Sequence, residues 1–252
     1  MSGAVPIRYI GHATVLLELD GVRIVTDPFL RDRLGPLERH GQLPDPASIG
    51  PVDVVLISHG HPDHFDRGSL AALEGHPIVV VPNGLGRTVG RWFGGDVVEL
   101  RAGQVARVRG VRVEAVRAKH WISPGAPRAQ PLGYVLGESA RVWFAGDTGR
   151  FREMRELRGA VDLALLPVWT WGPHLGPGHL GPEDAAAVVA EIGAGAALPI
   201  HWGTLYPRRL HRLWTAPLIE PGDRFAAAAA RIAPSTKVHV LRPGEGTVVR
   251  SS

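Results

Sequence analysis

Short apolar runs separated by turn residues recur along most of the chain, and this pattern predicts a protein rich in β-strands. The first part of the chain is predicted to contain strands at 7–10, 14–19 and 22–26. Asp20-Gly21, between the last two runs, is typical of a two-residue hairpin turn. The following segment, 28–51, is rich in Pro, Gly and charged residues, so we expect either a flap over a site or a surface excursion.

Strands and helices are expected to alternate in the remaining chain. Strands are predicted at 52–57, 78–81, 97–100, 104–109, 111–117, 132–136, 142–145, 161–168, 197–200 and 237–241. Helices are predicted at 69–73, 85–93, 151–157, 182–192 and 224–232. The clearest is 182–192, with Pro182 at its first position, acids in its first turn and Gly193 just past its end. No shift in composition marks a boundary, so residues 1–252 are predicted to form a single α/β domain.

Composition restricts the chemistry that the chain can perform. Hydrophobic residues make up 44% and charged residues 21% of the 252 residues, as in ordinary globular proteins. The chain has no cysteine, which excludes disulfides, thiolate nucleophiles and sulfur-ligated metals. Any metal must therefore be held by nitrogen and oxygen ligands.

The net charge of +4 comes almost entirely from arginine, since Lys119 and Lys237 are the only lysines. This charge favours an anionic small-molecule substrate but is too small to indicate nucleic acid or a membrane. Four arginines recur in the predicted strands around 100–117, namely Arg101, Arg107, Arg109 and Arg112. They could form a basic stripe that binds nucleic acid, but a solvent-exposed face of a sheet is the favoured interpretation. We find neither a signal peptide nor an apolar run long enough to span a membrane, and therefore expect a cytoplasmic protein. The sequence does not predict the oligomeric state.

Four metal-capable side chains lie within six consecutive positions directly behind the apolar run 52–57. They are His59, His61, Asp63 and His64, in the stretch Ser-His-Gly-His-Pro-Asp-His. Imidazole and carboxylate groups suit zinc, manganese or iron, and so short a loop must bring them together. This cluster predicts a metal site.

Further metal-capable residues follow other predicted strands. Asp27, His120, Asp147 and His201 each come at or just after the end of an apolar run. The carboxyl ends of neighbouring strands open on one edge of a sheet, where sites are commonly built. We therefore expect these residues to join the histidine cluster.

These residues, taken in order, resemble the five motifs of metallo-β-lactamase-fold hydrolases. The segments Tyr9-Ile10-Gly11-His12-Ala13-Thr14, Gly181-Pro182-Glu183-Asp184-Ala185 and Pro199-Ile200-His201-Trp202-Gly203 are similar to the branch containing ascorbate-phosphate lactonase and N-acylphosphatidylethanolamine phospholipase D. The resemblance covers essentially the whole chain. It implies a four-layer αββα sandwich of two mixed sheets flanked by helices.

The resemblance also implies a set of ligands and a reaction. His59, His61 and His120 would hold one divalent ion, Asp63, His64 and His201 a second, and Asp147 would bridge them. Zn²⁺ is the expected metal, with Mn²⁺ and Fe²⁺ as alternatives. A metal-bridging hydroxide would hydrolyse a small ester, lactone or phosphodiester. The alternative is a metal-dependent nuclease of the same fold that acts on RNA or DNA.

Several residues are expected to support this chemistry. Asp63 could orient the attacking water, and Asp27 could steady a ligand. In the loop 169–181, His179 is predicted to contact substrate or donate a proton to the leaving group. The residues expected to line the pocket or to support the ligands are His12, Trp169, Trp171 and His174. The two tryptophans could instead pack as simple cover.

Overall fold

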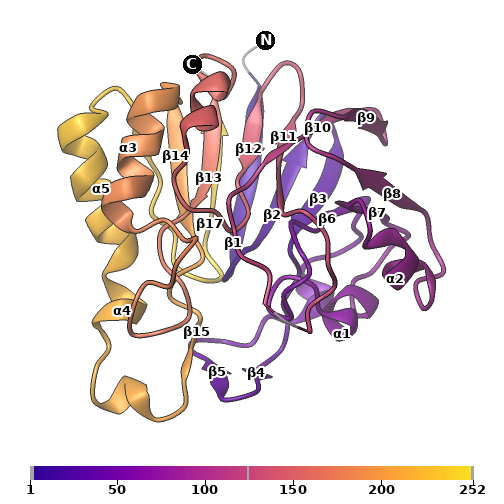
Figure 1. The fold of residues 1–252 in the computed structure, drawn as a ribbon, viewed down its shortest axis with the longest axis horizontal. Helices are drawn as coiled ribbons and strands as arrows, with labels where there is room; N and C mark the ends of the chain where they lie inside the picture. Colours follow the sequence, from indigo (N-terminus) through magenta and orange to yellow (C-terminus); the bar gives the residue numbers. More distant parts are fainter. Residues whose placement is uncertain (1–2, 124, 251–252) are drawn as a thin grey trace.

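The computed structural model describes residues 3–123 and 125–250; residues 1–2, 124 and 251–252 of the predicted domain lie outside this range. Two seven-stranded mixed sheets pack face to face, with helices on both outer sides (Figure 1). The predicted four-layer αββα sandwich is therefore confirmed. No helix in the described part of the chain is long and apolar enough to cross a membrane.

The first sheet combines an antiparallel half with a parallel half. Its order is β17 (Gly246–Arg250), β1 (Ala4–Gly11), β2 (Thr14–Leu19), β3 (Val22–Thr26), β6 (Val54–Leu56), β7 (Ile78–Pro82) and β8 (Val97–Leu100). Strands β17 to β3 pair antiparallel, and β3 to β8 pair parallel. The turn between β2 and β3 has positive φ angles at Asp20 and Gly21, 54° and 76°, as the predicted hairpin requires.

The second sheet has the same mixed character. Its order is β16 (Lys237–Val238), β14 (Ala196–Ile200), β13 (Leu163–Pro167), β12 (Val142–Phe144), β11 (Leu132–Leu136), β10 (Val111–Arg117) and β9 (Val105–Val108). The strands from β16 to β12 are parallel, and those from β12 to β9 are antiparallel.

Helices cover the outer faces because the sheets are apolar on both sides. The inner faces contribute buried residues such as Val15, Val113 and Phe144 to one continuous core. A separate apolar cluster lies where α1 (Arg67–Ala71) and α2 (Gly86–Gly90) cover the first sheet. Helices α3 (Pro182–Ile192) and α5 (Pro221–Ile232) cover the second sheet. Helix α3 ends at Gly193 with φ 69°, as its sequence predicted.

The predicted strands and helices are present, although several begin or end at a neighbouring residue. One predicted element differs in type and another in extent. Residues 152–157 form a 3₁₀ helix, η2, rather than an α-helix; the segment is short and no side chain caps its start. The predicted strand 237–241 pairs with β14 only at Lys237 and Val238. Elements not predicted are β17, β4 (Arg33–Leu34), β5 (Leu37–Arg39), β15 (Leu205–Pro207), η1 (Pro46–Ser48), η3 (Leu210–Arg212) and α4 (Ala216–Ile219).

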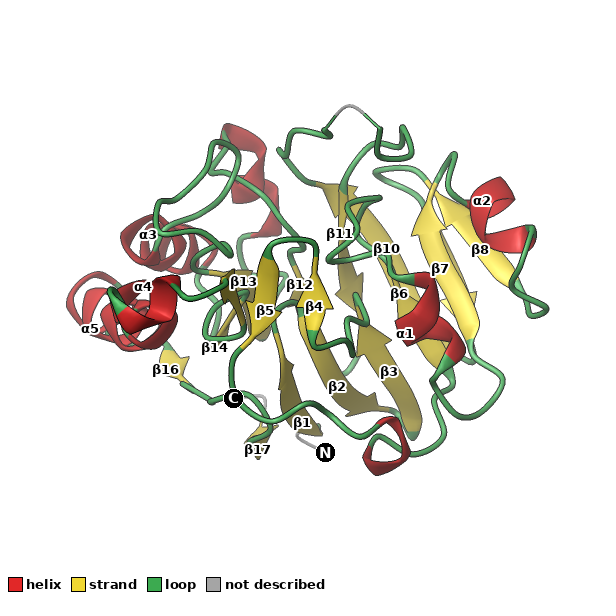
Figure 2. Ribbon diagram, turned by 90° about the horizontal axis from the view of Figure 1, so that it is seen from below, coloured by secondary structure: helices red, strands yellow, loops and turns green. Residues whose placement is uncertain are grey.

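A third, small sheet has the order β15-β5-β4. Two of its strands belong to the segment 28–51, and β15 follows shortly after β14. In Figure 2, seen from below, β4 and β5 lie in front of the two large sheets. The segment is therefore held by strand pairing at this end of the molecule.

Candidate metal centre

The predicted site residues gather at one end of the sandwich, because the strands that carry them end there. His12 follows β1, Asp27 follows β3, and the loop with His59 to His64 follows β6. From the second sheet come His120 after β10, Asp147 after β12 and His201 after β14. Both sheets thus contribute side chains to a single centre, as the sequence predicted.

Three histidines form the first group of facing nitrogens. His61 Nδ1 lies 2.9 Å from His59 Nε2 and 3.1 Å from His120 Nε2. Each ring points one nitrogen at the same point in space. This geometry suits a cation held by three imidazoles.

The second group combines histidines and carboxylates. His64 Nε2 lies 3.1 Å from His201 Nε2 and 3.6 Å from Asp63 Oδ2. The two oxygens of Asp147 lie 3.2 Å from these same two ring nitrogens, Oδ2 from His64 and Oδ1 from His201. Asp147 Oδ2 also lies 3.9 Å from His120 Nε2, which places this carboxylate between the two groups.

Hydrogen bonds on the outer side of three candidate histidine ligands determine which ring nitrogen carries the proton and which carries the lone pair. His64 Nδ1 faces Asp27 Oδ2 at 2.6 Å. His120 Nδ1 faces the Gly178 carbonyl at 3.0 Å, and His201 Nδ1 faces the Trp169 carbonyl at 3.1 Å. These oxygens accept a hydrogen bond from Nδ1–H, so in the neutral rings Nε2 has a lone pair directed inward. Lone pairs facing one another repel unless a cation lies between them, so these rings fit a metal.

His61 differs from the other rings. The backbone N–H of Ser123 donates to its Nε2 at 3.0 Å, which places the proton of the neutral ring on Nδ1. Binding of a cation at Nδ1 would move that proton to Nε2 and break the Ser123 hydrogen bond.

The charges at the centre also call for a cation. Asp27, Asp63 and Asp147 are all buried within a few ångströms of His64. Burial lowers the pKa of His64, but these three carboxylates outweigh burial and raise it well above its usual value. Asp147 Oδ1 is shielded from solvent and makes no hydrogen bond to any described residue. Such a cluster of buried carboxylates fits divalent metal ions.

Backbone strain is concentrated at this centre. His12, Asp27 and His201 are three of the described non-glycine residues with positive φ, at 58°, 31° and 62°. Left-handed backbone at non-glycine residues costs energy and often marks functional sites. The His201 N–H donates to the His12 carbonyl at 2.7 Å, which holds two of these residues together.

Two buried groups support the candidate ligands from behind. Asp27 accepts hydrogen bonds from the Ser58 backbone N–H, at 2.7 Å, and from the Ser58 hydroxyl, in addition to its contact with His64. His12 Nε2 lies 3.0 Å from Asp63 Oδ2. These positions agree with the supporting roles expected for Asp27 and His12. The role of Ser58 was not predicted, although it directly precedes the histidine cluster.

A cavity of about 530 Å³ opens onto the centre. His61, Asp63, His120 and Asp147 border it, together with His179, His174 and Trp171 from the loop 169–181. Trp169 does not line it, because its ring packs against the main core, but its carbonyl contacts His201. The structure thus has Trp169 behind a candidate ligand, and its ring packs as cover, the alternative that the sequence left open. The turn from Leu34 to Leu37 closes another side of the cavity and was not assigned residue by residue from the sequence.

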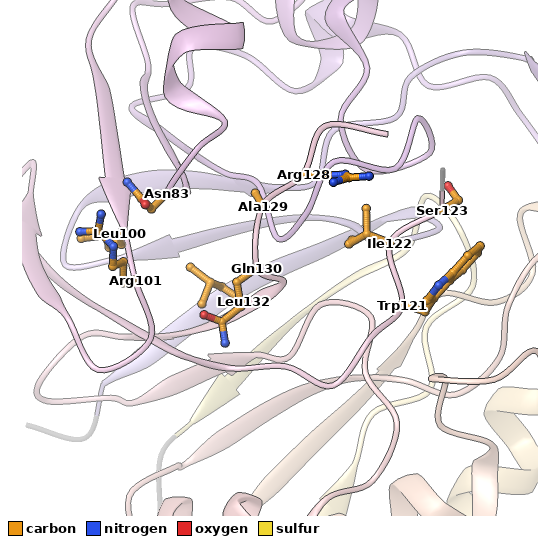
Figure 3. Close-up of a pocket in the computed structure, with 10 residues that line it drawn as sticks. All are labelled: Asn83, Leu100, Arg101, Trp121, Ile122, Ser123, Arg128, Ala129, Gln130 and Leu132. Carbon is orange, nitrogen blue, oxygen red and sulfur yellow. The ribbon is translucent and has the colours of Figure 1, made fainter. Parts of the chain in front are cut away.

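A second cavity, of about 660 Å³, shares two wall residues with the first, Trp121 and Ser123. In Figure 3, Arg101 and Trp121 lie at opposite ends of this cavity, with Arg128 between them. Trp121 is 61% exposed and borders both cavities. The two arginines give the second cavity a positive character.

Comparison with known proteins places this arrangement in a family. Residues 22–202 match the model of the beta-lactamase superfamily domain. The chain is 33% identical to the UPF0173 metal-dependent hydrolase TTHA1283 of Thermus thermophilus, over 96% of this chain and 97% of that protein. It is 30% identical to N-acyl-phosphatidylethanolamine-hydrolyzing phospholipase D 1 of Caenorhabditis elegans, over 86% of this chain and 67% of that protein.

Some relatives are longer than this chain. The uncharacterized protein Rv0906 of Mycobacterium tuberculosis is 34% identical over 88% of this chain, which spans 63% of that protein's length. Among solved structures, the metallo hydrolase Igni18 of Ignicoccus hospitalis superposes with a TM-score of 0.78 at 23% identity, covering 98% of this chain and 99% of that chain. This likeness agrees with the fold described above. The resemblance found in the sequence is thereby confirmed, and the chain belongs to the beta-lactamase superfamily.

Proposed function

We propose that the protein is a metal-dependent hydrolase that binds two divalent ions and cleaves a small ester, lactone or phosphodiester. One observation carries the proposal: nitrogens and carboxylate oxygens from both sheets face one another at a cavity of about 530 Å³, a size suited to small molecules. The names of the relatives, among them a metal-dependent hydrolase, support the same class of reaction.

The ligands divide into two sets in this proposal. His59, His61 and His120 would hold one ion, Asp63, His64 and His201 would hold the other, and Asp147, whose carboxylate lies between the two groups, would be a ligand of both. Zn²⁺ suits a set dominated by imidazole, with Mn²⁺ and Fe²⁺ as alternatives. When bound, such ions lower the pKa of a water molecule and polarise the carbonyl or phosphoryl oxygen under attack.

Asp63 is the proposed residue that orients the attacking water. It borders the cavity, and His12 holds one of its oxygens at 3.0 Å. Burial raises the pKa of Asp63, but the neighbouring His64 and the hydrogen bond from His12 outweigh burial and lower it below its usual range. The carboxylate therefore stays ionised and can accept a hydrogen bond from water.

His179 is the proposed proton donor for the leaving group. Its Nε2 lies 3.3 Å from Asp147 Oδ2, and its Nδ1 lies 3.2 Å from the Gly176 carbonyl. Oxygen acceptors at both nitrogens favour the protonated ring. Burial lowers the pKa of His179, but the hydrogen bond to Asp147 outweighs it, so the net shift is upward. A proton held at Nε2 on the cavity wall can pass to a departing oxygen.

Replacement of His179 by glutamine tests this role. We expect kcat to fall by about 100-fold to 10,000-fold, the usual contribution of general acid catalysis, while the bound metal is retained. The loss should be smaller for a nitrophenyl ester, whose leaving group departs without a proton. His76→Gln, at an exposed histidine, should leave kcat unchanged. Loss of metal from His179→Gln would instead indicate a ligand role, and an equal loss with both leaving groups would exclude proton donation.

We further propose that the substrate is anionic, with the second cavity receiving its charged part. Arg101 and Arg128 form no ion pair with any described residue, whereas Arg107 and Arg112 pair with Glu138 and Glu114. The paired arginines belong to a solvated sheet face, which gives a nuclease activity no particular support. Guanidinium groups without ion-pair partners among the described residues, in a cavity that adjoins the candidate site, favour a phosphate or carboxylate.

The double substitution of Arg101 and Arg128 by glutamine tests this preference. We expect KM for an anionic substrate to rise about tenfold or more, equivalent to about 1.4 kcal/mol, with kcat little changed. A neutral ester of the same leaving group should be unaffected. Arg231→Gln, which removes one arginine charge from α5, is the control for a change of charge away from the cavity. Equal effects on anionic and neutral substrates would contradict the proposal.

The reaction class itself is tested by a substrate screen. Purified protein supplied with zinc or manganese should hydrolyse at least one member of a lactone, ester, phosphodiester and amide panel, and a chelator should abolish the activity. Protein that binds metal but hydrolyses none of these substrates, or whose activity survives removal of the metal, would overturn the proposed function.

A further inference from the structure

A second group of metal-capable side chains lies outside the centre described above. Glu38 belongs to β5, His40 follows it, and His211 belongs to η3. Glu38 Oε1 lies 3.3 Å from His211 Nδ1 and 3.9 Å from His40 Nε2. The two imidazole rings lie 4.6 Å apart, centroid to centroid. We call these three residues the Glu38 cluster.

One ring nitrogen of each histidine in this cluster is buried without a hydrogen-bond partner among the described residues. Among the described residues, neither His40 Nε2 nor His211 Nδ1 has a partner, although each side chain as a whole is only partly buried. His211 Nδ1 is close to the Glu38 oxygen, yet the geometry is not that of a hydrogen bond. One ligand atom of each of the three residues lies within 4.8 Å of the other two. Unsatisfied buried polar atoms are rare and often mark an ion or water site.

The spacing of the cluster suits a transition metal. Two ligands about 2.1 Å from a tetrahedral zinc ion lie about 3.4 Å apart. Glu38 Oε1 and His211 Nδ1 match this separation at 3.3 Å, and His40 Nε2 lies somewhat farther from Glu38 Oε1, at 3.9 Å. Arg208 Nε lies 3.9 Å from the other oxygen, Oε2, of Glu38, so it does not occupy the same position.

We propose that Glu38, His40 and His211 bind a further divalent transition-metal ion of the zinc class. Two imidazoles and one carboxylate leave room for a water as the fourth ligand. This site is separate from the candidate hydrolytic centre and does not depend on the proposed function.

The position of the cluster gives the ion a structural role. The turn that ends at β5 borders the cavity of the candidate active site through Leu34 and Leu37. On the other side of the cluster, η3 leads to Trp214, whose ring lies 5.7 Å from that of His174, another residue of the cavity wall. An ion in the Glu38 cluster would therefore join two segments that shape the cavity, without touching the substrate.

Metal content measured by mass spectrometry after zinc loading and desalting tests the site. We expect His211→Ala to contain one zinc ion fewer per chain than the wild type, and His76→Ala, at an exposed histidine, to contain the same number. In competition with a chromophoric chelator, the affinity of that one ion should fall at least about tenfold. Equal metal content in His211→Ala and the wild type would overturn the proposal.

Two further variants distinguish loss of this ion from misfolding and from loss of the ions at the candidate active site. Glu38→Gln keeps the shape of the side chain and should also remove one ion, even if His211→Ala fails to fold. Asp147→Asn should lose ions of the active centre but still bind the ion that His211→Ala removes. If the Asp147→Asn and His211→Ala double variant binds no less zinc than Asp147→Asn alone, the third site is excluded.

Discussion

Replacement of Asp147 by asparagine is expected to lower kcat/KM by at least about 1000-fold, equivalent to about 4 kcal/mol of transition-state stabilisation. Asparagine keeps the size of the side chain but removes the negative charge that lies between the two groups of ligands. Without that charge, two closely spaced cations would repel each other with less compensation. Steady-state kinetics and metal analysis of the same preparation measure both losses.

Asp96→Asn is the matched control for this prediction. Asp96 is exposed, so the variant makes the same chemical change away from the centre and should leave activity and metal content unaltered. If Asp147→Asn retained activity within tenfold of the wild type together with its full metal content, Asp147 could not have the role proposed here.

Substitution of Asp27 by alanine is expected to lower the free energy of unfolding by about 3–5 kcal/mol, the usual cost of removing one partner from a buried ion pair. The change would leave the Ser58 backbone N–H, the Ser58 hydroxyl and His64 Nδ1 without their acceptor in a buried site. Urea denaturation of zinc-loaded protein measures the effect. Metal affinity should fall as well, because Asp27 orients the His64 ring.

Asp32→Ala provides the comparison for stability. The Asp32 side chain is 71% exposed and pairs only loosely with Arg33, so its removal should change the unfolding free energy by no more than about 0.5 kcal/mol. A loss below about 1 kcal/mol in Asp27→Ala would show that the buried hydrogen-bond network contributes little to stability.

The large sheets and the convergence of the candidate ligands could be predicted from the sequence because both depend on local patterns. Apolar runs define the strands, and a ligand such as His120 or His201 at the end of a strand must lie at the edge of the sheet. Five strands and one helix match their predicted bounds, namely β2 (Thr14–Leu19), β3 (Val22–Thr26), β8 (Val97–Leu100), β10 (Val111–Arg117), β11 (Leu132–Leu136) and α3 (Pro182–Ile192).

The walls of the cavity could not be predicted in the same way. Strands β4 and β5 contain two and three residues, too few for an apolar period to be recognised. The pairing of β5 with β15 joins segments far apart in the chain. The direction of the Trp169 ring depends on whether the core or the cavity offers it more contact. No local pattern contains that information, so the sequence left both positions of the ring open.

Contacts behind the ligands are also invisible in a local pattern. Ser58 meets Asp27 across 31 positions of the chain, and His12 meets Asp63 across 51. The Glu38 cluster likewise joins β5 to η3, although its residues are ordinary surface types in the sequence. Such groups become visible only when the fold brings them within bonding distance.

An anomalous difference map from crystals grown with zinc, with data collected on both sides of the zinc absorption edge, tests the central claim most directly. Two strong peaks are predicted on either side of the Asp147 carboxylate, one bordered by His59, His61 and His120 and the other by Asp63, His64 and His201. A map without peaks at these side chains, from protein saturated with zinc, would contradict the assignment of a two-metal centre.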